Sequence, residues 1–144
     1  MKSSDPHDLE RFVVAQKDVY EQVLGELARG EKASHWMWFV FPQLKALGRS
    51  GTAKRFGIAS RAEAAAYLAH PLLGARLLDC TRLMLFVEGR TALQVLGSPD
   101  DLKFRSSMTL FAALDPTAPE FQLALAKYYA GAADDETLRL LGKA

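Results

Sequence analysis

The sequence predicts an all-α fold, a single compact bundle of six to eight helices. Three observations predict it: helix start signals recur along the chain, apolar residues follow most of them at spacings of three and four, and no two segments qualify as a pair of strands. Serine, threonine and aspartate are the side chains that cap helix N-termini. Candidate caps stand at Asp5, Ser34, Ser60, Ser98, Thr117 and Asp134.

The first half of the chain is expected to hold two helices and a loop. Asp5 and Pro6 open a first helix that runs to Arg29 and is stopped by Gly30. A short second helix, capped by Ser34, holds an aromatic stretch, residues 34–43, and breaks at its proline. Residues 45–59 combine glycines with cations and are expected to form a loop.

The second half is expected to be helical almost throughout. A capping box at Ser60–Glu63 opens a helix to about residue 69, and a longer, nearly all-round apolar helix covers Pro71–Val87 and is therefore expected to be central. Further helices are expected from the cap-plus-proline signal at Ser98–Pro99 through about Ala113, over 121–130, and from Asp134 through Leu141.

Composition narrows the class of protein. The 144 residues fit one helical domain, 1–144, and the net charge of +1 makes a nucleic-acid partner unlikely. Cys80 is the single cysteine, so it forms no internal disulfide and is expected to be a buried thiol. We expect no signal peptide and no membrane span, hence a cytoplasmic protein. The oligomeric state stays open, a homo-oligomer included.

The histidines give no case for a metal site. They stand at His7, His35 and His70, and none has a second histidine or a cysteine at ligand spacing. No glycine pattern matches a nucleotide-binding fingerprint either. We therefore predict no metal and no resident cofactor.

The aromatic stretch is the first place where chemistry could lie. Trp36 and Trp38 have faces on which a base or a cation could stack, while His35 and Gln43 could orient a ligand. Each also has a purely structural interpretation. The tryptophans are more often core residues, but side chains two apart on a helix point in different directions, so one of them could face a cleft.

The second place is the segment Lys103–Phe111. Lys103 and Arg105 could bind an anion, and Ser106 and Ser107 could fix its orientation; solvated cations and back-bonded serines are the alternatives. Gln16 lies on the core-facing stripe of the first helix, where it either bonds loop backbone or lines a polar pocket. Arg49 in the expected loop is a further candidate for a phosphate.

Several segments resemble a known family. Residues 8–16, His35–Gln43, Tyr67–Gly74 and Lys103–Phe111 together look like a small bacterial family of unknown function. Its members are sometimes labelled calpastatin, a name that implies a disordered, repetitive protease inhibitor and disagrees with this compact chain.

The helix that contains Glu10–Lys17 is also similar to the Glu-His-aromatic-Phe-Gln-Ala-Gln-Lys helix of the NADAR superfamily, helical proteins linked to NAD and ADP-ribose that include N-glycosidic hydrolases. This resemblance implies that Glu10 is catalytic and that Arg11, Lys103 and Arg105 hold a pyrophosphate. A carboxylate such as Glu10 could stabilise the oxocarbenium-like transition state or activate water. A solvated glutamate in the first turn is the plain alternative.

The residue pattern predicts a pocket for a nucleotide-like ligand, and the resemblance to the NADAR superfamily implies that an enzyme of this kind would hydrolyse an N-glycosidic bond of an ADP-ribosyl compound. The pocket would lie between the first helix, the aromatic stretch and the Lys103–Phe111 helix, with Gln16, His35 and Ser107 pointing into one concavity. The alternative is a noncatalytic helical protein–protein interaction module, for which an exposed patch including Trp36 or Phe41 is expected.

Overall fold

The computed structural model describes residues 5–142, and this part of the chain folds into helices and loops. It confirms the all-α fold, with a helix count above the expected six to eight. The ten α-helices and one 3-10 helix of the described part are α1 (Glu10–Lys17), α2 (Tyr20–Arg29), α3 (Met37–Val40), η1 (Lys45–Leu47, 3-10), α4 (Gly51–Arg55), α5 (Arg61–Ala69), α6 (Leu73–Phe86), α7 (Ala92–Leu96), α8 (Asp100–Leu114), α9 (Pro119–Tyr129) and α10 (Asp135–Leu141).

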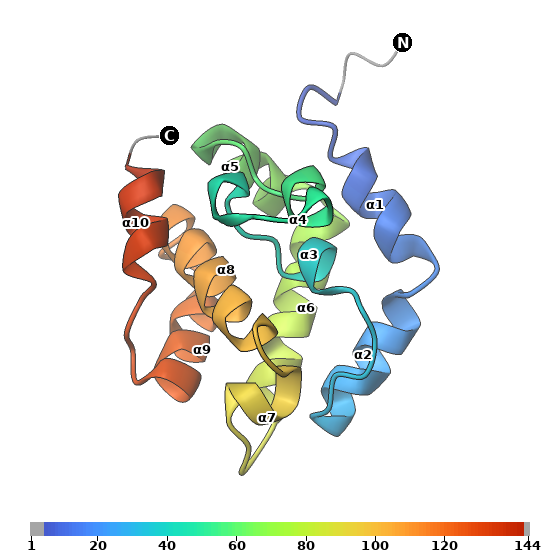
Figure 1. The fold of residues 1–144 in the computed structure, drawn as a ribbon, viewed down its shortest axis with the longest axis vertical. Helices are drawn as coiled ribbons and strands as arrows, with labels where there is room; N and C mark the ends of the chain where they lie inside the picture. Colours follow the sequence, from blue (N-terminus) through green and yellow to red (C-terminus); the bar gives the residue numbers. More distant parts are fainter. Residues whose placement is uncertain (1–4, 143–144) are drawn as a thin grey trace.

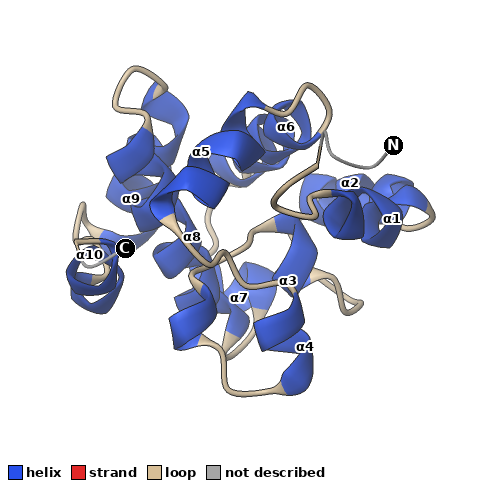
Figure 2. Ribbon diagram, turned by 90° about the horizontal axis from the view of Figure 1, so that it is seen from above, coloured by secondary structure: helices blue, strands red, loops and turns tan. Residues whose placement is uncertain are grey.

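The two longest helices, α6 and α8, stand in the middle of the molecule (Figure 1). Helices α1 and α2 lie on one side of them and α9 and α10 on the other, and the view from above shows only helices and loops in the described part (Figure 2). α6 contacts α2, α3, α5 and α9, as expected of a nearly all-round apolar helix. α8 contacts α5, α7, α9 and α10.

Trp36 and Phe41 of the aromatic stretch lie in the core. Phe41 packs edge-on against Phe104 of α8 with ring centroids 4.8 Å apart, and Trp36 is 6.3 Å from Phe41. Phe12 of α1 meets Tyr67 of α5 in the same edge-on manner at 5.0 Å. Each such aromatic pair stabilises the fold by about 0.5–1.5 kcal/mol beyond the contribution of the apolar area that it buries.

The first two expected helices differ from the structure. The long first helix is in fact two, because the helical hydrogen bonds stop at Asp18 and resume after Val19, two residues of low helix propensity. The break directs α1 towards α3 and α2 towards α6. Ser34 does not cap α3, whose N-cap position is held by Trp36, because the serine side chain bonds to Glu26 instead.

The expected loop 45–59 is partly helical. It holds η1 and α4, and Ser50 caps α4 by accepting a hydrogen bond from the N–H of Ala53. An isolated parallel bridge between Leu44 and Ile58 closes its two ends. The expected caps at Ser60 and Asp134 are confirmed, since their side chains accept from the N–H groups of Glu63 and Thr137.

Candidate functional site

The carboxylate of Glu26 organises the segment that joins α2 to α3. The residue lies on the apolar stripe of α2 and is 1% exposed. Its Oε1 accepts from the backbone N–H of Ala33 (2.8 Å), from that of Ser34 (3.1 Å) and from the indole Nε1–H of Trp36 (2.8 Å). Its Oε2 accepts from the Ser34 hydroxyl (2.6 Å) and from Gln22 (3.0 Å). The segment is therefore wrapped around one buried charge.

These hydrogen bonds explain how Glu26 stays ionised in the core. Burial by itself raises the pKa of a carboxyl group, but the hydrogen bonds from Ser34, Ala33, Trp36 and Gln22 outweigh it and lower the pKa of Glu26 from 4.5 to about 2. A carboxylate that accepts several bonds is stable without a cation beside it.

Lys32 fastens the same segment to α8. Its side chain is 7% exposed, and its ammonium lies 2.8 Å from Oδ2 of Asp100 and donates to the carbonyl of Ser34 at 2.6 Å. Its backbone N–H donates to the carbonyl of Val95 in α7 at 2.7 Å. The segment between α2 and α3 is thus bound to α8 through the Lys32 side chain and to α7 through the Lys32 backbone.

Because this segment is fixed, part of the aromatic stretch is buried in the core and part of it lies at the surface. Trp36 is 1% exposed, so its expected role as a stacking platform is wrong: its ring packs inside and its N–H is taken by Glu26. Trp38 is half-buried and His35 is exposed. The ammonium of Lys103 lies 5.3 Å from the ring centre of Trp38, within the range of a cation–π contact.

A hollow of about 380 Å³ opens at this point. Its walls come from the segment after α2, from the aromatic stretch and from the start of α8. The lining residues are Lys32, Ala33, Ser34, His35, Trp36, Met37, Trp38, Leu96, Ser98, Pro99, Asp100 and Lys103.

A second hollow, of about 470 Å³, shares Pro99 and Lys103 with the first. We call the two together the Lys103 cleft. The second hollow is lined by three segments distant in sequence, and two of them carry candidate residues: Gln43 and Arg49 in one, Lys103 and Ser106 in the other. Its lining residues are Gln43, Leu47, Gly48, Arg49, Ser50, Ala53, Pro99, Leu102, Lys103, Ser106, Asp134 and Glu136.

The closed loop between Leu44 and Ile58 positions Arg49 on the wall of the cleft opposite α8. Lys45 donates its N–H to the carbonyl of Ile58 at 2.8 Å, and Ile58 donates to Gln43 at 2.9 Å. A Cβ at Gly57 would stand 2.4 Å from the Cα of Lys45, so the two ends of the loop approach each other as closely as glycine allows. Arg49 is exposed at the far end of this braced loop.

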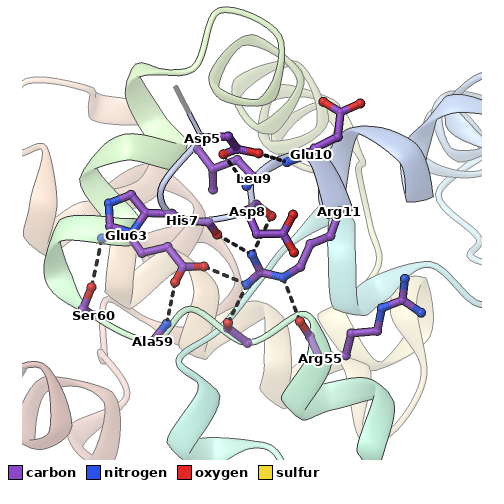
Figure 3. Close-up of polar contacts among 11 residues, drawn as sticks. Asp5, His7, Asp8, Leu9, Glu10, Arg11, Arg55, Ala59, Ser60 and Glu63 are labelled. Atoms are coloured by element: carbon purple, nitrogen blue, oxygen red, sulfur yellow. Dashed lines mark hydrogen bonds and ion pairs between the residues drawn. The ribbon is translucent and has the colours of Figure 1, made fainter. Parts of the chain in front are cut away.

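Arg11 is a structural cross-link, which corrects its expected role as a pyrophosphate ligand. Figure 3 shows the guanidinium between the N-terminal segment, the end of α4 and α5. All five of its N–H donors are used. The acceptors are the carbonyls of His7 (2.8 Å), Asp8 (2.8 Å), Arg55 (2.8 Å) and Gly57 (3.0 Å) and the carboxylate of Glu63 (2.7 Å).

Gln16 and Ser107 are enclosed in the core. Gln16 is 2% exposed and donates to the carbonyl of Phe39 at 2.7 Å while its own carbonyl accepts from Arg76 at 3.2 Å, so it bonds backbone rather than lining a pocket. Ser107 is fully buried, and its hydroxyl has no partner among the described residues. The prediction that these two share one concavity with His35 is therefore wrong, since His35 lies at the Lys103 cleft.

The two residues that follow Phe104 in α8, Arg105 and Ser106, have different roles. Arg105 donates to the carbonyls of Ala132 (2.9 Å) and Ala133 (3.0 Å), so it holds the connection between α9 and α10 and does not line the cleft. Ser106 does line it, and its hydroxyl donates to the Asp134 carboxylate at 2.9 Å.

Glu10 lies in a different hollow, of about 560 Å³, between the N-terminal segment, α1 and α5. It is exposed, and the imidazoles of His7 and His70 line the same space. His70 is also a cap, because its Nδ1 accepts from the backbone N–H of Leu73 at 3.1 Å. Neither Lys103 nor any residue of the aromatic stretch reaches this hollow.

Sequence reasoning missed three charged residues that hold the walls of the Lys103 cleft in place: Glu26, Lys32 and Asp100. A faint signal exists for Glu26, which interrupts the apolar stripe of α2 between Val23 and Leu27. Within residues 5–142 no group of three or more His, Cys, Asp or Glu side chains is arranged to hold a metal ion. None of the described helices is long and apolar enough to cross a membrane.

Fold and cleft thus define a small helical protein with a surface cleft that is lined by tryptophan and by charged side chains of both signs. The chain belongs to the family described as protein of unknown function DUF1810, whose pattern matches residues 6–141. It is similar to the crystal structure of the conserved hypothetical protein Rv1873 from Mycobacterium tuberculosis, with a TM-score of 0.94 and 54% identity over 96% of this chain and 99% of that one. No curated protein matches.

Glu26→Gln should destabilise the protein by about 3 kcal/mol at neutral pH, because the amide must present N–H groups to partners that all donate. A depressed carboxyl pKa contributes stability above pH 4.5 that is lost as the pH falls towards 2, so the difference between wild type and variant should shrink over that range. Urea unfolding at several pH values measures it. Glu10→Gln is the exposed control, and a difference that stays constant down to pH 2 would contradict the account.

Arg11→Lys should lower the free energy of unfolding by about 2–3 kcal/mol, because an ammonium cannot reproduce five donors in a planar fork and leaves Glu63 and several carbonyls short of partners. Urea unfolding beside the exposed control Arg61→Lys measures the effect. Equal stability of the two variants would show that the cross-link contributes little.

Proposed function

We propose that the protein binds a nucleotide-like small molecule in the Lys103 cleft. The observation that carries the proposal is the position of the Lys103 ammonium, on the wall shared by the two hollows and above the ring of Trp38. A ligand with an anionic group and a planar ring needs such a cation beside an aromatic face. Hollows of this size fall within the range of small-molecule sites.

The donors at the cleft are available, unlike those of Arg11 and Arg105. The nearest carboxylate oxygen to the Lys103 ammonium, on Asp100, is 3.8 Å away, beyond hydrogen-bond distance. Arg49 of the closed loop lines the same hollow and is exposed. An anion that reaches both residues would gain two cations without breaking a short ion pair of Lys103, provided that it avoids the carboxylates of Asp134 and Glu136 in the same lining. Trp38 and His35 offer the faces on which its ring would stack.

The resemblance to the NADAR superfamily supports a finer proposal, that the ligand is NAD or ADP-ribose and that an N-glycosidic bond is hydrolysed. Glu10 is the carboxylate that this resemblance implies, and it stands with His7 and His70 in its own hollow. Hydrolysis by Glu10 therefore requires the sugar to reach that hollow and not the Lys103 cleft. Loss of nicotinamide from NAD that is abolished by Glu10→Gln would support the finer proposal.

A second candidate, the protein–protein interaction module, is favoured by one observation: Phe86 at the end of α6 is 78% exposed. The surface first expected for it is absent, because Trp36 and Phe41 are each 1% exposed. Phe86→Ser should weaken association with a protein partner without changing nucleotide binding.

The cleft proposal predicts selective thermal stabilisation by AMP, GMP, NAD or ADP-ribose over citrate. A ligand at 100 times its dissociation constant stabilises the fold by about 2.7 kcal/mol, which is several degrees in Tm for a chain of this size. Lys103→Met should remove the shift. Lys127→Met is the matched control, because the Lys127 ammonium also lies over a ring, 5.5 Å from that of Tyr128, but on the outer face of α9. No shift with any nucleotide, or an unchanged shift in Lys103→Met, would contradict the proposal.

A further inference from the structure

One carboxylate, that of Asp100, stands between the two lysine ammonium groups of the Lys103 cleft. Its Oδ2 is 2.8 Å from the ammonium of Lys32, and its Oδ1 is 3.8 Å from that of Lys103. The side chains of Lys32, Asp100 and Lys103 are 7%, 18% and 23% exposed. The pair on the Lys32 side is short and buried, whereas the contact on the Lys103 side is long and open to the cleft.

Lys32 belongs to the framework rather than to the ligand surface. Its ammonium is held by Asp100 Oδ2 and by the Ser34 carbonyl, and it lies 5.1 Å from the ring centre of Trp36. Removing it from these contacts would leave a buried charge unpaired, which is costly. Lys32 therefore compensates the charge of Asp100, and Lys103 is left as the cation that can serve a ligand.

Asp100 Oδ1 has unused capacity. A carboxylate oxygen carries two lone pairs, and the one contact of Oδ1 among the described residues is the Lys103 ammonium at 3.8 Å, too long for a hydrogen bond. Asp100 lines the hollow that holds Trp38 and His35. The cleft thus presents a cation and, next to it, a bare hydrogen-bond acceptor.

The position of Asp100 beside Lys103 restricts which chemical groups a ligand can place in the cleft. An anionic group that reaches Lys103 comes close to Asp100, and a second negative group placed there would be repelled. A hydroxyl would instead donate a hydrogen bond to Oδ1 in place of water. We infer that Asp100 accepts a hydrogen bond from a sugar hydroxyl of the ligand that Lys103 holds, so that the cleft selects a ribose phosphate over a bare polyanion. The inference rests on the proposed nucleotide-binding function and names its specificity residue.

Calorimetric titration of the wild-type protein with AMP and with 2′,3′-dideoxy-AMP tests this inference without any variant. AMP should bind about tenfold more tightly, since one hydrogen bond to a charged acceptor is lost in the dideoxy compound. Asp100→Asn should reduce that preference and bind inorganic pyrophosphate more tightly than the wild type, because the repelling charge is gone. The amide oxygen of Asn can still accept from Lys32, but the buried ammonium loses its opposite charge, so the variant should unfold at a lower temperature than the wild type and is titrated well below that temperature.

The outcomes separate the two claims. Equal affinity for both nucleotides, with binding still lost in Lys103→Met, would overturn the role of Asp100 and leave the cleft proposal standing. An undiminished preference for AMP in Asp100→Asn would also overturn that role. Absence of binding by both nucleotides would overturn the cleft proposal and the inference with it.

Discussion

The buried Glu26 carboxylate is the interaction on which the arrangement of the cleft depends. Its five hydrogen bonds bend the segment after α2 around a single charge and take the indole N–H of Trp36 into the core. With Trp36 fixed inside, the following turn carries Trp38 to the surface, where it meets Lys103. One carboxylate thereby decides which tryptophan packs and which can contact a ligand.

Counting donors separates the structural cations from those that can serve a ligand. Arg11 uses all five of its N–H groups, and Arg105 is bonded to two backbone carbonyls. Lys32 is tied to Asp100 and Ser34. The Lys103 ammonium lies 3.8 Å from the Asp100 carboxylate and 5.3 Å from the ring centre of Trp38, so it can serve a ligand, as can the exposed Arg49. Residues of the same type therefore have opposite roles, which contact geometry alone reveals.

The local signals in the sequence were sufficient for the helical fold. Caps at Ser60 and Asp134 and the apolar spacing of α6 are read directly from neighbouring residues. The break at Asp18 was not foreseen, because the apolar stripe continues across it, although α1 packs on α3 and α2 on α6. Propensity is a weak prior when tertiary contacts compete with it.

The candidate site was predictable in its parts and not in its assembly. Residues such as Trp38, Gln43 and Lys103 stood out by type, but the closed loop that brings Arg49 opposite α8 depends on a bridge between segments that carry no strand pattern. Arg11 and Gln16 are not available to a ligand, because long-range contacts pair them with residues of α3, α5 and α6. Spacing along the chain holds no information about such partners.

The most direct test of the account is the response of the two indole N–H signals in ¹H–¹⁵N spectra to AMP, with Trp38→Phe used for assignment. The account predicts that the Trp38 signal moves on titration, while the Trp36 signal stays in place and exchanges slowly with solvent because its N–H is bonded to buried Glu26. A Trp36 signal that moves as far as that of Trp38, or two signals that stay fixed at saturating AMP, would contradict it.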